Sequence, residues 1–243
     1  MPVRDEIKSS LIEQLWIPTC VKGGMVLSKK KKRKELTVLT LTSRSNCDEV
    51  RRFIEEGLTE RELTYVWTGS YYERVWLETE LGDVHFIGPE RLEDAVHNFN
   101  GSLNNAYPFH IINLDFSSQN PVLEEGRIEQ ELESLETIIY NQSRKNVDFI
   151  LIYTTILDGH HIDVTNICDA SEQQMLLGWP GITLDERFLQ GPVCDLEDKV
   201  EVIEAIIIEM ANKYNYKIEL KTLTVPDENI GAILSVASLI RRL

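Results

Sequence analysis

The sequence predicts an α/β fold in which helices on both faces of a mostly parallel sheet form a three-layer sandwich. Segments rich in β-branched residues alternate with segments of helical periodicity from Leu36 to Tyr214, which is typical of successive βαβ units with right-handed crossovers. In the middle of the chain, Phe109 to Phe116 has the character of a buried strand that ends at an acid, Asp115. The last two predicted strands are joined only by residues 226–229, so they must be antiparallel neighbours.

The first 34 residues are expected to form a helix and a basic linker ahead of the main domain, which spans residues 35–243. A helix is predicted from Arg4 to Trp16, because apolar residues recur there at helical spacing. Pro18 is expected to end this helix, and residues 21–28, with Gly23-Gly24, are expected to form a loop.

An uninterrupted basic run comes next, formed by Lys29, Lys30, Lys31, Lys32, Arg33 and Lys34. One interpretation is a nucleic-acid contact or a localisation signal. The other, which we favour, is a solvated linker ahead of the first core strand, because a run of this length is a weak signal by itself. If any surface of this protein contacts phosphate, this run is the first candidate.

Three strand and helix pairs follow the linker. Strands are predicted where β-branched and aromatic residues gather, at residues 36–41, 63–67 and 84–87. Helices are predicted after them, at about residues 48–56, at residues 70–81, and from Pro89 onward. Gly57 and Gly82 are placed to end the first two helices, and Pro89 is placed to open the third.

The second half of the chain continues the alternation up to the antiparallel pair. The predicted elements are a strand at 109–115, a helix at 124–145, a strand at 147–153, a helix at 196–214, and strands at 216–224 and 230–239. Residues 154–192 follow no regular pattern. In the helix at 124–145, a set of carboxylates is expected to face solvent, namely Glu125, Glu129, Glu133 and Glu136.

Composition limits the classes of function. A net charge of −15 argues against a surface that binds nucleic acid or anionic membrane as a whole, because phosphate repels such a field. It still allows a local basic patch. The four cysteines form no Cys-x-x-Cys pair, which favours reduced thiols in a cytoplasmic protein. No apolar segment has the length of a membrane span, and no signal sequence is expected.

The element order resembles the class I S-adenosylmethionine-dependent methyltransferase fold, which is Rossmann-like. The resemblance is one of topology and covers the chain from about Leu36 to the end. It implies a seven-stranded sheet in which the last strand is inserted antiparallel. Leu39 to Val50 lies where the first signature of the family lies, and Asn113 to Phe116 lies where the fourth lies. The match is in position and not in residue type.

By position, the resemblance implies that S-adenosylmethionine would be held by Thr42, Ser43, Thr68, Glu90 and Asn113. The sequence departs from the family at three of these contacts. The loop at 42–46 has no glycine, although the cofactor must approach the backbone closely there. The second strand ends without an acid, and Glu90 is the nearest acid after the third. Together these departures predict that the cofactor binds poorly or not at all.

Asp115 and Phe116 are the candidate catalytic residues at the carboxyl edge of the sheet, where ligands bind in open α/β folds. His160 is a candidate general base in the segment from Asp158 to Asp163. That segment also contains His161, and metal ligation is its alternative interpretation. We expect a surface loop and no metal, because neighbouring histidines in regular structure point in different directions.

Three functions remain open at this point. We favour a non-catalytic methyltransferase-like subunit, a pseudoenzyme that binds a protein partner, or nucleic acid, within a larger assembly. The second is an active S-adenosylmethionine-dependent methyltransferase with an unusual cofactor loop. The third is a metal-dependent hydrolase or nuclease that uses Asp115, Asp158 and the two histidines. Fold alone does not decide among them.

Overall fold

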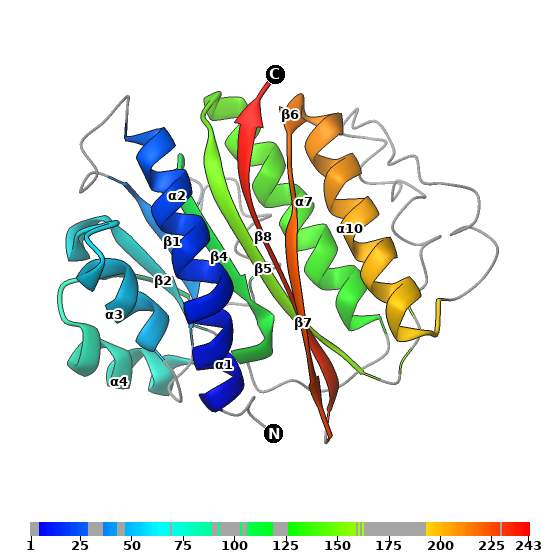
Figure 1. The fold of residues 1–243 in the computed structure, drawn as a ribbon. Coiled ribbons are helices and arrows are strands. Elements are labelled where there is room, and N and C mark those ends of the chain that lie inside the picture. Colours follow the sequence, from blue (N-terminus) through cyan, green and yellow to red (C-terminus); the bar gives the residue numbers. More distant parts are fainter. Residues whose placement is uncertain are drawn as a thin grey trace.

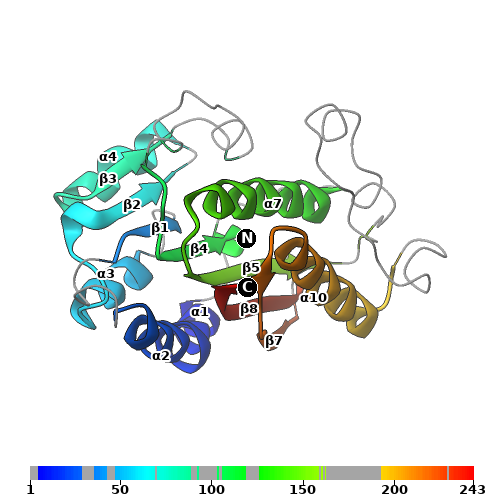
Figure 2. The same ribbon diagram turned by 90° about the horizontal axis from the view of Figure 1, so that it is seen from above.

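The computed structural model describes residues 5–28, 36–42, 47–68, 70–88, 92, 103, 106–118, 126–158, 160, 162, 193–228 and 230–243. In this part of the chain an eight-stranded sheet lies between two layers of helices (Figure 1). Figure 2 shows the three layers from above, with α2 and α7 on opposite faces of the sheet. Among the described residues, no helix combines the length and apolar character needed to cross a bilayer.

The parallel part of the sheet has the strand order β3-β2-β1-β4-β5. Its strands are β1 (Val38–Leu41), β2 (Thr64–Trp67), β3 (His85–Ile87), β4 (Ile111–Asp115) and β5 (Phe149–Leu157). β1 lies at the centre, with β2 on one side and β4 on the other, and both pairings are parallel. This order reverses at β1, so the crevice beyond the carboxyl ends of β1 and β4 is the expected ligand position in such a sheet.

The antiparallel part is built on the long strand β8 (Gly231–Arg242), which pairs with β5. β6 (Tyr216–Lys217) and β7 (Lys221–Asp227) both pair with β8 in the antiparallel sense. These are the two halves of the strand predicted at 216–224. They are separate because the hydroxyl of Ser238 bonds to the backbone N–H and C=O of Glu219 in place of a strand partner. The Rossmann-like order with an antiparallel insertion is thus confirmed, with eight strands where seven were predicted.

Helices of the first layer are α1 (Asp5–Leu11), the π-helical η1 (Ile12–Trp16), α2 (Ile17–Leu27), α3 (Asp48–Glu55) and α4 (Tyr71–Leu81). The second layer contains α7 (Arg127–Lys145) and α10 (Leu196–Lys213). Two short 3₁₀ turns, η3 (Arg61–Leu63) and η4 (Phe116–Ser118), precede β2 and follow β4. Gly57 and Gly82 lie at positive φ directly after α3 and α4, as predicted.

The N-terminal helical segment is longer than predicted. It continues from Asp5 to Leu27 through Pro18, so the predicted stop at Pro18 and the predicted loop at 21–28 are both wrong. Pro18 lies where the π-helical turn η1 passes into α2. A π-helical turn shifts the backbone hydrogen bonds by one residue, which lets the helix continue past a residue that has no N–H. The segment packs on the sheet, and its apolar residues share one hydrophobic cluster with β5 and β8.

The prediction that four glutamates of the helix expected at 124–145 face solvent is also partly wrong. Glu136 is buried, where its carboxylate pairs with the Lys213 ammonium and accepts a hydrogen bond of 2.9 Å from the Tyr214 hydroxyl. α10 covers this side of α7, so a carboxylate there needs partners from α10. Glu133 is exposed and Glu129 is partly exposed, in line with the prediction, while Glu125 lies outside the described residues.

Gly23 lets α2 approach the sheet closely. A Cβ atom at Gly23 would lie 2.8 Å from both Cγ1 and Cδ1 of Ile150, whereas one at Gly24 would lie 3.4 Å from its nearest neighbour, on Leu58. We expect Gly23→Ala to destabilise the protein by about 1 kcal/mol, because overpacking costs about 1–3 kcal/mol and better helix propensity returns about 1 kcal/mol. Gly24→Ala, the matched control, should be neutral or stabilising in urea unfolding. Equal effects of the two changes would contradict this close approach.

Candidate functional site

The carboxyl end of β4 is where the sequence placed the reactive edge. Side chains along β4 alternate between the two faces, and Ile112 and Leu114 belong to the cluster beneath α7 and α10. Ile111 belongs to the cluster beneath α1 and α2. Asp115 shares the face of Ile111, and its side chain is completely buried beneath the N-terminal helices.

Asp115 is held by a cation from the N-terminal helix. The ammonium of Lys8, on α1, lies 2.9 Å from Oδ2 of Asp115 and 3.3 Å from Oε2 of Glu49 on α3. Lys8 is 3% exposed, and the two carboxylates are 0% exposed. We call these three residues the Lys8 cluster. It joins α1, α3 and β4 at the edge where a cofactor would be expected.

The charges of the Lys8 cluster are coupled. Burial raises the pKa of Glu49, the Lys8 ammonium lowers it, and the nearby Asp115 carboxylate raises it, with a net shift upward. Burial lowers the pKa of Lys8, but the negative charges of Asp115 and Glu49 outweigh burial, and the net shift is again upward. Lys8 therefore stays a cation that neutralises one carboxylate, while Glu49 retains a proton more tightly than it would in water.

Both oxygens of Asp115 are engaged within the protein. Ser117, in η4, donates a hydrogen bond of 2.5 Å to Oδ1, and Lys8 binds Oδ2. Thr42 hydrogen-bonds to Glu49 and thereby lowers the pKa of that carboxyl. A carboxylate enclosed in this way cannot accept a proton from a substrate while α1 is in place, because no substrate atom can reach hydrogen-bond distance.

A second set of buried polar contacts fixes the N-terminal helices beside the Lys8 cluster. The indole N–H of Trp16 donates a hydrogen bond of 2.8 Å to the hydroxyl of Ser235 on β8, which lies 2.7 Å from the hydroxyl of Thr154 on β5. All three side chains are buried. Because Trp16 ends the π-helical turn, that turn sets the position of the indole over the sheet.

The structure brings some of the predicted cofactor contacts together and separates others. Thr42 is buried and belongs to the surroundings of the Lys8 cluster. Asn113, also buried, donates a hydrogen bond of 3.1 Å from its amide to the hydroxyl of Thr40. The hydroxyl of Thr68 donates to Glu73 at 3.1 Å, near the start of α4. Ser43 and Glu90 lie outside the described residues.

The predicted catalytic residues do not form one site. Phe116 is buried, and its ring packs against that of Tyr153 in an edge arrangement with centroids 5.8 Å apart. His160 is exposed, and its contacts are those of its backbone: its N–H donates to Asp158 Oδ1 at 2.9 Å, and its carbonyl accepts from the Lys199 ammonium at 2.5 Å. Neither the ring contact of Phe116 nor these backbone contacts of His160 involve Asp115.

Asp158 belongs to a separate buried ion-pair cluster at the end of β5. Arg127 pairs with Glu131 and lies 3.6 Å from Asp158, and the Tyr153 hydroxyl donates to Glu131 at 3.1 Å. Burial raises the pKa of Glu131 and the Arg127 guanidinium opposes that rise, with a net shift upward. These groups pair with one another, so their arrangement stabilises the junction of α7 and β5.

A metal-dependent reaction has no support from the described part of the chain. No three His, Cys, Asp or Glu side chains gather there in an arrangement that could hold an ion. His161 and Asp163 lie outside the described residues.

Sequence analysis missed Lys8 and Glu49 as members of the site. A signal for Lys8 was available, because Lys8 precedes Leu11, Ile12 and Leu15 by three, four and seven positions, and so lies on the apolar face of the helix. A lysine on such a face must find a buried partner or leave the core. Glu49 carried no comparable signal, since an acid in the first turn of a helix is usually exposed.

Solved structures that are similar in fold to this chain share little sequence with it. No family model matches the chain, and no curated protein matches its sequence. Similar solved structures include the plantazolicin methyltransferase BpumL in complex with SAH, with TM-score 0.49 and 11% identity over 98% of this chain and 90% of that one. A SAM-dependent methyltransferase from Methanosarcina mazei has TM-score 0.45 and 9% identity over 90% and 97%.

A third similar structure is the methyltransferase domain of bacterial CtHen1, with TM-score 0.44 and 12% identity over 92% of this chain and 98% of that one. At these values the likenesses carry no argument about activity. The assignment of a class I methyltransferase-like, Rossmann-like fold rests on the strand order and on the antiparallel position of β8.

Proposed function

We propose that this chain is a non-catalytic methyltransferase-like subunit that acts by binding a partner. The observation that carries the proposal is the enclosure of Asp115, the acid at the predicted reactive edge, by Lys8 and Ser117. Asp115 is 0% exposed. An acid used in methyl transfer must be reachable by the substrate or the cofactor, and side chains of the protein itself cover this one.

The N-terminal helices support the same conclusion. They cover the face of the sheet that leads to the carboxyl end of β4, and they are fixed there by both the Lys8 cluster and the contact from Trp16 to Ser235. Releasing them would break both sets of buried polar contacts and expose the apolar cluster that the helices share with β5 and β8. This cost keeps the cover in place, and the glycine-free segment at 42–46 adds a second obstacle to a cofactor.

Calorimetric titration with S-adenosylmethionine and S-adenosylhomocysteine tests this proposal. We expect no binding heat at millimolar ligand and no change in melting temperature. A ligand present at a hundred times its dissociation constant would stabilise the folded state by about 2.7 kcal/mol, so even modest binding would be visible. Saturable binding of either ligand would overturn the proposal and favour an active methyltransferase with an unusual cofactor loop.

If binding were observed, Asp115→Asn would show whether the enclosed acid takes part in it. An unchanged affinity would place the ligand away from the Lys8 cluster. A large loss of affinity, in a variant whose melting temperature is close to that of the wild type, would show that Asp115 faces the ligand.

A further inference from the structure

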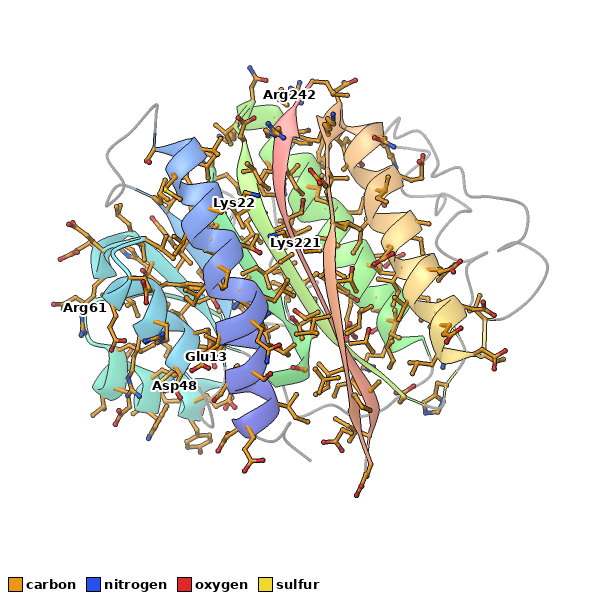
Figure 3. All side chains as sticks on the ribbon, in the orientation of Figure 1. Glu13, Lys22, Asp48, Arg61, Lys221 and Arg242 are labelled. Carbon is orange, nitrogen blue, oxygen red and sulfur yellow. The ribbon has the colours of Figure 1, made fainter. Side chains whose placement is uncertain are left out.

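We propose that a groove between α2 and the antiparallel end of the sheet binds an acidic peptide segment that also carries apolar side chains. The groove has a volume of about 270 Å³. Figure 3 shows Lys22 on α2 and Lys221 on β7 on the two sides of the strip of sheet between these elements. We call it the α2–β7 groove. This proposal names the partner-binding surface of the subunit proposed above.

The α2–β7 groove and the Lys8 cluster lie toward opposite ends of the parallel strands. Its floor includes Ala237 and Leu239 of β8, in the part of β8 that pairs with the first half of β5. Asp115 pairs with Thr154, in the second half of β5. Because β4 and β5 are parallel, the groove belongs to the amino end of the parallel strands, and Asp115 to the carboxyl end.

The break between β6 and β7 contributes one wall of the groove. Ser238 holds the backbone of Glu219 by two hydrogen bonds, of 3.3 and 2.8 Å, where a continuous strand would otherwise run. The residues that line the groove on this side are Lys217, Ile218, Glu219 and Lys221. The opposite wall is α2, which lies close to the sheet because Gly23 has no side chain.

The charge of the groove is opposite to that of the whole protein. Four cations line it, Lys22, Lys217, Lys221 and Arg241, together with one carboxylate, Glu219, which gives 4 − 1 = +3 against a net charge of −15. In the part of the chain that the structure describes, none of the four cations makes an ion pair or a side-chain hydrogen bond. Four unpaired cations around one groove favour an anionic occupant.

The rest of the lining decides the kind of anion. Apolar side chains face the space between the cations, among them Val26, Ile218 and Leu239, and Val26 is 40% exposed. Among the described residues that line the groove none is aromatic, so they offer single-stranded nucleic acid no surface on which its bases could stack. In an extended peptide, successive side chains point to opposite sides, so apolar residues can enter the groove while carboxylates meet its cations.

Salt screening allows this local attraction despite the negative charge of the whole protein. At physiological ionic strength, charges more than about 8 Å apart are largely screened, so an acidic segment in the groove responds mainly to the nearby cations. The basic run from Lys29 to Lys34, which begins two residues after α2 ends at Leu27, lies outside the described residues. The test below leaves that run unchanged.

Fluorescence anisotropy with a short labelled peptide of alternating glutamate and leucine tests the groove in the full chain. We expect saturable binding that weakens as salt is raised. The double variant Lys22→Glu/Lys221→Glu should lower the affinity about tenfold or more, because two attractive contacts become repulsive. A peptide of alternating glutamine and leucine should bind the wild type at least about tenfold more weakly, since it lacks the carboxylates.

The control variant is Arg144→Glu/Lys145→Glu at the end of α7, on the opposite face of the sheet (Figure 2). It changes the net charge by the same amount and should leave peptide affinity unchanged. An equal loss in this control, or no binding by the wild type, would overturn the proposal. Binding of polyuridylate or of phosphatidylserine vesicles that depends on Lys22 and Lys221, without peptide binding, would show that the class of partner is wrong.

The cofactor test and the peptide test can fail independently of each other. Binding of S-adenosylmethionine would overturn the non-catalytic function and leave the groove result as it stands. Absence of peptide binding would remove the groove as the partner surface while the cofactor result remained valid.

Discussion

Replacing Lys8 with methionine is expected to lower the free energy of unfolding by about 3–5 kcal/mol, because it leaves a buried charge without its partner. Lys8 is the cation that faces both Asp115 and Glu49, and all three side chains are buried. Methionine keeps most of the volume of the aliphatic stem, so the decrease in the free energy of unfolding reflects the loss of the ammonium. Urea unfolding of the variant and the wild type measures this decrease.

Glu49→Gln is the matched change within the same cluster. It removes one of two carboxylates that share a single ammonium and leaves the 2.9 Å pair between Lys8 and Asp115 in place. We expect it to cost less than about 1.5 kcal/mol, since a buried amide needs hydrogen bonds but carries no charge. A loss as large as that of Lys8→Met would contradict the assignment of Lys8 as the charge that stabilises the cluster.

The cost of Lys8→Met should depend on pH in a defined direction. Without the ammonium, the pKa of Glu49 rises further, because burial and the Asp115 carboxylate already raise it and Lys8 has the largest lowering effect. A carboxyl with a raised pKa in the folded state contributes stability that is present below its unfolded pKa, near 4.3, and lost as pH rises through the folded pKa. The difference between variant and wild type should therefore be smallest near pH 4 and grow toward pH 7.

Gly231→Ala is expected to lower the free energy of unfolding by about 3 kcal/mol or more. Gly231 begins β8 at φ +96°, and a Cβ atom there would collide with the backbone carbonyl oxygen of Leu157 and lie 3.4 Å from Cα of Asp158. Overpacking against backbone costs about 1–3 kcal/mol or more, and the left-handed conformation adds about 1–2 kcal/mol for a residue with a side chain.

Gly57→Ala separates the two parts of that cost. Gly57 also has a positive φ, +64°, but a Cβ atom there would meet nothing within 4 Å. Its substitution should cost only the conformational part, about 1–2 kcal/mol. If thermal unfolding gave the same loss for both variants, the close approach of β8 to the end of β5 would be contradicted.

Much of the fold was predictable because alternation of strand and helix patterns sets the topology of an α/β sheet. The strands ending at Leu41, Trp67 and Asp115 were expected close to where they lie, and the link at 226–229 correctly indicated an antiparallel pair. The division of the strand at 216–224 was not predictable, since it depends on a hydrogen bond from Ser238 across the sheet.

The N-terminal helices were misjudged for a reason that local rules do not capture. Pro18 and Gly23-Gly24 both disfavour a helix in isolation. In the folded protein, Pro18 follows the π-helical turn η1 and Gly23 allows close packing on Ile150, so tertiary contacts outweigh propensity. Lys8 lies in the part of this helix that was predicted, but its ion pair with Asp115 depends on how the helix packs on the sheet, which local patterns do not give.

The position of the candidate site was predictable from the sequence, but its burial and its ion pairs were not. Asp115 was expected at the carboxyl edge and lies there. Its burial, and its pairing with a residue more than a hundred positions earlier in the chain, follow from long-range packing. Phe116 was expected beside Asp115 because it is the next residue, and it packs in the core. His160 was expected there because loops after adjacent strands meet at one edge, and its side chain is exposed.

The most direct test of the enclosure of Asp115 is the rate at which individual lysine side chains are acylated in the folded protein, measured at each site by mass spectrometry. Lys22 and Lys221 are exposed and serve as internal references, while Lys8 is 3% exposed, and its pKa is raised by Asp115 and Glu49 against the effect of burial. We expect rapid labelling of both references and no labelling of Lys8 until the protein unfolds. Labelling of Lys8 at the rate of Lys22 would show that α1 does not cover Asp115 and would contradict the proposed enclosure of this acid.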